Sequence, residues 1–262
     1  IRITDEQWAL IEPHLPALPR RKDGRGRPWR SDRECLDGIL WILKTGAQWK
    51  ALPKEFPGYA TCWRRLRMWE ERDVWKDVWR AVLGALDEKG LLEWEETFLD
   101  ATFVSAKKGA TQSAHQEGKG IEAAVLVVGE GLPVGVQLAA ANEGETSLAQ
   151  PTVEEVAKLA GDDPACWPQR IIADKAYDSD ELRAAFASVD IQLLAPHRSN
   201  RTAKTRSNDG RCMRRYKRRW IVERFFAWLN GFRRLIVRHE RHSLMYRAFV
   251  HVACVLVTMR AL

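Results

Sequence analysis

The stretch that decides the fold is Thr97-Phe98-Leu99-Asp100-Ala101-Thr102-Phe103-Val104, where the hydrophobic pattern changes from helical spacing to a period of two. Such an alternation over several residues is typical of a β-strand. Two further strands are predicted at residues 121–128 and 132–140, and the Gly129-Glu130-Gly131 between them is typical of a hairpin turn. The pattern therefore predicts an antiparallel sheet that begins near residue 97.

Helices and strands alternate after these three strands. The predicted helices are residues 147–160, 179–186, 214–232 and 244–260, and the predicted strands are residues 170–174 and 191–195. Antiparallel strands followed by alternating helices and strands indicate a mixed sheet covered by helices. We therefore predict an α/β (α+β) fold for residues 91–262.

The first 90 residues show helical spacing instead. Eight of the 12 tryptophans fall at or before Trp79 and recur at intervals typical of packed helices. Ser31-Asp32-Arg33-Glu34 forms a capping box, Gly46 is typical of a helix end, and Thr61 is a candidate N-cap. These signals predict a small all-helical domain over residues 1–90, followed by the second domain.

Composition excludes several classes of protein. The 262 residues are 45% hydrophobic, which is too apolar for a disordered chain. The longest apolar stretch near the end, residues 249–259, is too short to cross a bilayer, so we expect no membrane span. The five cysteines are scattered and the first residues are charged, which favours reduced thiols in a cytoplasmic protein.

Positive charge is unevenly distributed along the chain. The net charge is +7, yet residues 197–247 hold 16 Lys and Arg against 3 Asp and Glu. A block this basic indicates a surface for a polyanion such as nucleic acid. The alternative is a solvated charged face.

Three acids are candidates for catalysis. Asp100 and Asp174 stand on or just after two different apolar strands, and Glu223 lies on the basic helix. Each has a simple structural alternative: a local hydrogen bond for Asp100, a helix N-cap for Asp174, and an ion pair with Arg219 for Glu223. Taken together beside a cationic surface, three carboxylates indicate a Mg²⁺ site for phosphoryl transfer on nucleic acid.

Two motifs around these acids resemble those of bacterial insertion-sequence transposases of the DDE superfamily. Asp174-Lys175-Ala176-Tyr177-Asp178-Ser179 is similar to the second-Asp motif of those enzymes, with Ala176 in place of a common Gly. The Tyr-(2)-Arg-(3)-Glu-(6)-Lys signature resembles the set Tyr216, Arg219, Glu223 and Asn230. Asn230 replaces the usual Lys, which leaves any phosphate contact there weaker or supplied by neighbouring arginines.

The N-terminal segment carries a third likeness. The opening residues 3–8, together with residues 46–53, resemble the N-terminal helical domain of the IS-five-like branch of these transposases. The likeness therefore runs nearly from end to end of the chain.

The resemblance implies a ribonuclease-H-like catalytic domain in which Asp100, Asp174 and Glu223 hold two Mg²⁺ ions, with Mn²⁺ able to substitute. It implies a DNA transposase that binds terminal inverted repeats, cleaves DNA strands and transfers a 3′ hydroxyl into target DNA. Tyr216 and Arg219 would position the phosphate or the flanking strand. The alternatives are a metal-dependent nuclease without strand transfer and a non-catalytic DNA-binding regulator.

Two elements of the first domain are candidates for reading DNA. The basic arm over residues 20–30 contains Arg25 and Arg27, which suit a narrow minor groove. Residues 61–69 are predicted to form a helix-turn-helix-like recognition helix with Arg64, Arg65 and Arg67 facing outward. The alternatives are a basic linker and a solvated basic helix.

The expected partners follow from this function. We expect double-stranded DNA, as transposon ends and as target, and a homodimer or higher multimer because two ends must meet. The expected location is the bacterial cytoplasm, at the nucleoid.

Overall fold

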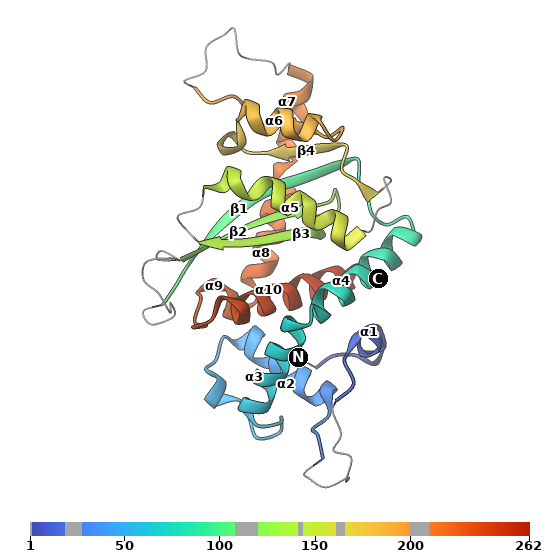
Figure 1. Ribbon diagram of the computed structural model, residues 1–262, viewed down its shortest axis with the longest axis vertical. Helices are drawn as coiled ribbons and strands as arrows, with labels where there is room; N and C mark the ends of the chain where they lie inside the picture. The colour runs from blue at the N-terminus through green and yellow to red at the C-terminus, as the bar shows by residue number, and fades with distance from the viewer. Residues whose placement is uncertain (1, 19–27, 108–119, 141–143, 161–165, 200–209) are drawn as a thin grey trace.

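The computed structural model describes residues 2–18, 28–107, 120–140, 144–160, 166–199 and 210–262. A five-stranded mixed sheet lies above a layer of helices in the view of Figure 1. Its strands are β1 (Glu96–Ser105), β2 (Gly120–Val127), β3 (Pro133–Ala140), β4 (Arg170–Ala173) and β5 (Gln192–Leu194). The predicted strands are present, and their ends differ from the prediction by at most one residue.

The strand order is β3-β2-β1-β4-β5. The strands β1, β2 and β3 pair antiparallel, whereas β4 pairs parallel with both β1 and β5. Leu99 on β1 is opposite Ala173 on β4, so the next residues, Asp100 and Asp174, come at the same level of neighbouring strands. The register alone therefore brings two of the three predicted acids together.

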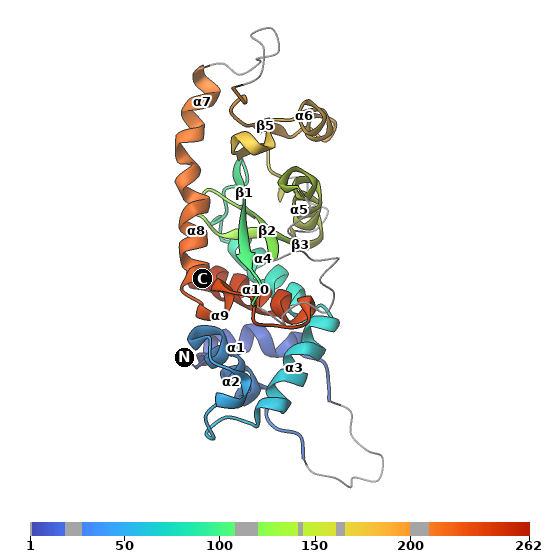
Figure 2. The same cartoon turned by 90° about the vertical axis from the view of Figure 1, so that its left-hand side faces the viewer.

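Helices cover both faces of the sheet, as Figure 2 shows. One face carries α5 (Glu145–Ala160) and α6 (Asp180–Ala187), and the other carries α7 (Gly210–Tyr216) and α8 (Trp220–Asn230). The strand β2 is buried along its whole length because it is covered on both sides. At Gly135 a Cβ atom would lie 2.6 Å from the carbonyl oxygen of Thr152, so α5 approaches β3 closely only because this residue is glycine.

The long basic helix predicted over residues 214–232 is divided in the structure. Between α7 and α8 the residues Lys217–Arg219 form a 3₁₀ turn, so the two helices make one nearly continuous column (Figure 2). A 3₁₀ turn is wound more tightly than an α-helix, which changes the angular position of the side chains that follow it. Arg219 stands at the end of this turn.

The N-terminal segment is helical, as predicted. It contains α1 (Asp5–Ile11), α2 (Asp32–Thr45), α3 (Tyr59–Glu71) and α4 (Val74–Glu88). Ser31 caps α2, and Gly46 ends it in the left-handed conformation with φ of 70°. The prediction of Thr61 as N-cap of the next helix is wrong, because α3 begins two residues earlier and Gly58 is its N-cap.

The last long helix, α10 (Ser243–Thr258), joins the two halves of the chain. Segment 243–261 is long and apolar enough to cross a membrane by length and composition alone, but 72% of its most apolar window is buried inside the protein. The helix packs against α3, α4 and β3, which explains its apolar composition. The side chain of Glu70 on α3 accepts hydrogen bonds from Arg247 and His251 on α10. The hydrophobic core therefore continues across the predicted domain boundary at residue 90, which stays a prediction.

Candidate active site

Asp100 lies in the middle of β1 on the face covered by α8. Its Oδ2 atom is 2.9 Å from Nη2 of Arg219, and its Oδ1 atom accepts a hydrogen bond from the backbone N–H of Ala101. The side chain is 13% exposed. Burial raises the pKa of Asp100, although the charge of Arg219 and its hydrogen bond oppose the shift.

Asp174 follows β4 and is held by the turn after it. Its Oδ1 atom accepts a hydrogen bond of 2.6 Å from the backbone N–H of Ala176, and so it caps the short 3₁₀ turn Lys175–Tyr177. The capping role considered for Asp174 is thus present. The other carboxylate oxygen remains available and lies 3.9 Å from Nη1 of Arg219.

Glu223 is the most exposed of the three acids. It lies in the first turn of α8 with 63% of its side chain exposed, and Oε1 is 4.0 Å from Nη2 of Arg219. The intrahelical pair considered for Glu223 is therefore also present. The same guanidinium, however, lies within 4.0 Å of all three predicted acids, which come from three different elements.

Arg219 is the centre of this arrangement. Its Nη1 atom also donates to the hydroxyl of Tyr216, 3.2 Å away. Although burial opposes the charged form, the hydrogen bonds to Tyr216 and Asp100 and the negative charge of Asp100 raise the pKa of Arg219. Within the described part of the chain, no three Asp, Glu, His or Cys side chains are close enough together to hold a metal ion as they stand. The acids converge on the guanidinium rather than on one another.

Glu145 is a neighbour of the site that the sequence analysis missed. It lies in the first turn of α5. Burial, followed by the negative charges of Glu122, Asp174 and Asp100, raises the pKa of Glu145. Its only sequence signal is an acid at a helix N-terminus, which is common on any helix. Neither the period of the strands nor a motif marks it.

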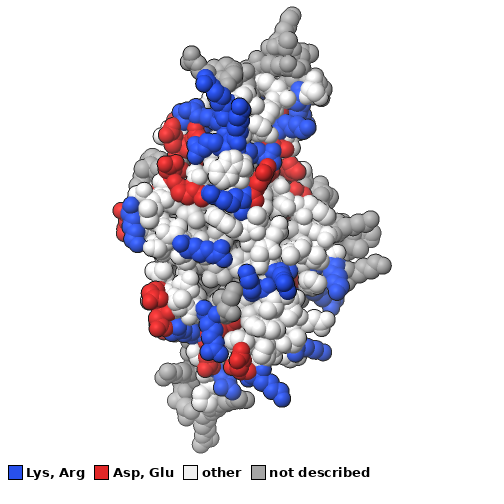
Figure 3. Space-filling view, turned by 180° about the vertical axis from the view of Figure 1, so that it is seen from behind, with Lys and Arg blue, Asp and Glu red and all other residues white. Residues whose placement is uncertain are grey.

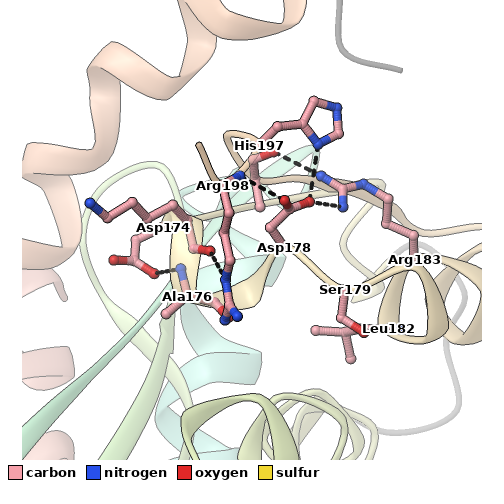
Figure 4. Close-up of polar contacts among 10 residues, drawn as sticks. Asp174, Ala176, Asp178, Ser179, Leu182, Arg183, His197 and Arg198 are labelled. Atoms are coloured by element: carbon pink, nitrogen blue, oxygen red, sulfur yellow. Dashed lines mark hydrogen bonds and ion pairs between the residues drawn. The ribbon is translucent and has the colours of Figure 1, made fainter. Parts of the chain in front are cut away.

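A buried network fixes the segment that follows Asp174 (Figure 4). The carboxylate of Asp178 accepts hydrogen bonds from the side chain of Arg183 and the backbone N–H of Arg198, both at 2.8 Å. Nδ1 of His197 is 3.1 Å from the same carboxylate. Asp178 therefore ties the turn after β4 to the segment after β5.

The outward-facing role predicted for Arg65 is wrong. Its side chain is 3% exposed and forms an ion pair with Asp32 on α2. The guanidinium also lies over the rings of Trp29 and Trp69, at 5.6 and 5.9 Å from their centroids. Arg65 is on the inward face of α3, and burial of its charge is compensated by the carboxylate and the aromatic rings.

The other two arginines of α3 are exposed, as predicted. Arg64 lines two cavities near the start of the helix. One, of about 530 Å³, is also lined by Trp63, and the other, of about 630 Å³, is also lined by Thr61. Arg67 donates to Glu71 at 2.8 Å in an exposed pair. The N-terminal end of α3 is therefore the part of this helix that is open to a ligand.

The remaining predicted contacts are not brought to the acids. Arg25 and Arg27 lie outside the described residues. Asn230 is exposed at the end of α8, seven residues or about 10 Å of helix beyond Glu223. It lines a small cavity of about 70 Å³ with Thr102.

The face of the sheet covered by α7 carries acidic side chains among its basic ones. Figure 3 shows Lys and Arg side chains gathered together with Asp and Glu side chains over the upper part of this face. Arg215 and Arg218 both pair with Glu96, at 2.5 and 2.7 Å. They line a cavity of about 590 Å³ together with Arg214.

Known proteins are similar to both the N-terminal and the C-terminal part of this chain. A family model described as "Transposase DDE domain" matches residues 95–258, and one described as "Putative transposase of IS4/5 family" matches residues 3–79. The "Insertion element IS402 uncharacterized 16.2 kDa protein" of Burkholderia cepacia is 40% identical over 44% of this chain and 79% of its own length. The "Putative transposase for insertion sequence element IS402" of the same organism is 30% identical over 53% of this chain and 62% of its own length.

The fold has a solved counterpart. A piggyBac transposase in a synaptic complex with hairpin DNA has a TM-score of 0.54 with this chain at 11% identity, covering 98% of this chain and 72% of that one. The predicted ribonuclease-H-like mixed sheet flanked by helices is confirmed. Because the transposase DDE model matches more than half of its residues, the chain belongs to the DDE transposases.

Proposed function

We propose that this DNA transposase cleaves DNA at the terminal inverted repeats of its element and joins the 3′ hydroxyl to target DNA, with Asp100, Asp174 and Glu223 as its catalytic acids. One observation carries the assignment. Carboxylates from β1, from the end of β4 and from α8 all lie within 4.0 Å of a single guanidinium. Acids far apart in sequence are gathered around a positive charge, as a cation site requires.

The donor set suits a divalent metal ion, on which DDE transposases depend. Carboxylate oxygens are hard ligands of the kind that Mg²⁺ and Mn²⁺ prefer. We assign Asp100, Asp174 and Glu223 to hold two Mg²⁺ ions, with Mn²⁺ able to substitute. When bound, such ions polarise the phosphate and stabilise the attacking and leaving oxygens.

The protein's own groups orient the reactants. Asp100 is the least exposed of the three acids, and its strand β1 contacts both β4 and α8, so it would hold the metal from between the elements that carry Asp174 and Glu223. Asp174 has one oxygen fixed by the backbone of Ala176, which limits how far its carboxylate can turn. Tyr216 and Arg219 would position the phosphate or the flanking strand through hydrogen bonds and charge.

DNA would be held by several surfaces. We assign end binding to the predicted domain over residues 1–90, through the arm with Arg25 and Arg27 and the exposed Arg64 and Arg67 of α3. The basic segment over residues 198–219 would contact the DNA backbone. A homodimer or larger synapse would bring two ends together, at the nucleoid of a bacterial cell.

The test separates chemistry from binding. In a plasmid carrying the element, we expect Asp100→Asn, Asp174→Asn and Glu223→Gln each to abolish cleavage while binding of the ends survives. Asp77→Asn, which removes a charge from an exposed pair with Arg80, is the matched control and should cleave normally. Near-normal cleavage by a triad variant would remove that residue from the site. Cleavage without joining would identify a nuclease, and binding without any cleavage by the wild-type chain would identify a regulator.

A further inference from the structure

Among the described residues, Asp100, Asp174 and Glu223 share one ion-pair partner, the guanidinium of Arg219. Nη2 of Arg219 is 2.9 Å from Asp100 and 4.0 Å from Glu223, and Nη1 is 3.9 Å from Asp174. Only the contact with Asp100 is short enough to be a hydrogen bond, and the other two are longer ion pairs. The guanidinium therefore lies where it attracts all three acids, while binding only one of them closely.

The hydrogen bonding of this guanidinium is incomplete. Its Nε atom is buried and has no hydrogen-bond partner among the described residues. Its side chain is 22% exposed, so it has a path to solvent. A buried donor without a partner is unfavourable, so the structure does not hold Arg219 in this position through a full set of bonds.

We propose that Arg219 is the resident counter-ion of the metal-free site and that a divalent ion and this guanidinium exclude each other there. The inference rests on the proposed function, because it takes the three acids as metal ligands. The three acids as they stand form no metal-binding group within the described part of the chain, and the guanidinium lies within 4.0 Å of each of them. A divalent ion at the same carboxylates would repel the guanidinium at close range.

The exchange has two consequences. Without metal, Arg219 keeps three carboxylates together that would otherwise repel one another. With metal, its departure costs free energy, so the apparent metal affinity of the free protein is lower than the affinity of the acids themselves. Arg219 thereby lowers the apparent affinity of the site for the divalent ion.

The test measures metal binding without catalysis. Mn²⁺ is titrated into the full chain without DNA, and bound ion is followed by electron paramagnetic resonance. We expect Arg219→Gln to bind Mn²⁺ at least about tenfold more tightly than wild type, because one competing charge at contact distance is removed. Arg219→Lys, which keeps a charge but has no planar fork, should lie between the two.

Arg218→Gln is the matched control. Arg218 lies in the same 3₁₀ turn, and its replacement by Gln removes the same charge. Its ion-pair partner, however, is Glu96 and none of the three proposed metal ligands. A second readout is thermal unfolding with and without Ca²⁺. Arg219→Gln should melt lower than wild type without metal and gain more in Tm when Ca²⁺ is added.

The outcomes are distinct. Equal Mn²⁺ affinity of wild type, Arg219→Gln and Arg219→Lys would overturn the exchange and leave the acids as metal ligands. Equally tight binding by Arg218→Gln would also overturn it, since general charge would then explain the effect. Mn²⁺ binding that survives Asp100→Asn unchanged in every background would overturn the proposed metal site itself.

Discussion

The carboxylate of Asp178 accepts a hydrogen bond from the backbone N–H of Arg198, which follows it by 20 residues. The side chain of Arg198 in turn donates hydrogen bonds to the carbonyl oxygens of Lys175 and Ala176. These bonds, visible in Figure 4, fix the turn that Asp174 caps. The position of a proposed catalytic acid therefore depends on a second, fully buried acid.

We expect Asp178→Asn to lower the free energy of unfolding by about 3–5 kcal/mol at pH 7, because it leaves the buried partners of a charged group uncompensated. Although burial alone would raise the pKa of Asp178, its hydrogen bonds with Arg198, Arg183 and His197 lower it. The stability from this group is thus present above the ordinary value of 3.8 and is lost as the pH falls through the lowered pKa. Urea unfolding at pH 7, 5, 3 and 2 should show the difference from wild type shrinking only below about pH 4. A difference in the free energy of unfolding that stays constant with pH would show that the charge of Asp178 does not contribute to stability.

Arg65 and Arg64 should have opposite phenotypes although they are neighbours. Arg65→Ala should destabilise the fold by about 1–3 kcal/mol, since it leaves Asp32 without its ion-pair partner and removes packing against Trp29 and Trp69. Arg64→Ala should leave unfolding unchanged and weaken binding to the cognate end by about 1–3 kcal/mol if it reads a base. Thermal unfolding and gel-shift titrations of both variants check this. An unstable Arg64→Ala would contradict it.

The contact of Glu70 with α10 predicts that the two halves of the chain depend on each other. Glu70 is buried and binds both Arg247 and His251. Glu70→Gln should cost about 3–5 kcal/mol and should lower the stability of both halves in one transition. Residues 1–90 expressed alone should unfold more easily than the same helices in the whole chain, as near- and far-ultraviolet circular dichroism would show. Two separate transitions in the full chain would contradict this.

The basic residues of α7 should differ in how they contribute to DNA affinity. Arg215 already pairs with Glu96, whereas Arg214 is exposed in the same cavity. Arg214→Ala should weaken binding of cognate and random DNA alike and reduce the salt slope by about one. Arg215→Ala should have a smaller effect, because its charge is already neutralised in part. Equal slopes for the two variants would show that Glu96 releases its partner when DNA binds.

The agreement between sequence and fold was close where the signals are local. The strands, Gly46 and the Ser31 cap follow from alternation and cap chemistry over a few residues, so they are visible without tertiary information. The sequence marks Asp100 as a candidate because it stands within an apolar strand, and Asp174 because it directly follows one. Parallel pairing of β1 with β4 then made them neighbours.

The positions of some side chains depend on tertiary partners, which the sequence does not reveal. Arg65 is turned inward by Asp32 of another helix, which no pattern within α3 reveals. The sequence predicts one uniform helix over residues 214–232, whereas Arg219 lies in a 3₁₀ turn and bonds to Asp100 of the sheet. Glu145 gains its neighbours through the packing of α5 on the sheet.

The choice of metal should separate assembly from chemistry. If the three carboxylates hold hard-oxygen divalent ions, Mg²⁺ and Mn²⁺ should both support cleavage and joining. Ca²⁺ is larger and accepts looser geometry, so it should support assembly of the protein with DNA ends but little or no reaction. Gel shifts with end DNA and cleavage assays in each metal measure the two properties separately. Full cleavage in Ca²⁺ would contradict the assignment of Asp100, Asp174 and Glu223 as a site of strict geometry.

Cleavage and joining should also require the same acids. Water and a 3′ hydroxyl are interchangeable nucleophiles in one in-line arrangement, so a single site can serve both reactions. Glu223→Ala is the sharpest variant, because Glu223 is exposed on α8 and its removal should disturb packing least. Supplied with pre-cut ends, this variant should fail to join them, just as it fails to cut a plasmid. If it joined pre-cut ends at the wild-type rate while remaining unable to cleave, the two reactions would have different sites, because the loss of a shared metal ligand must affect both.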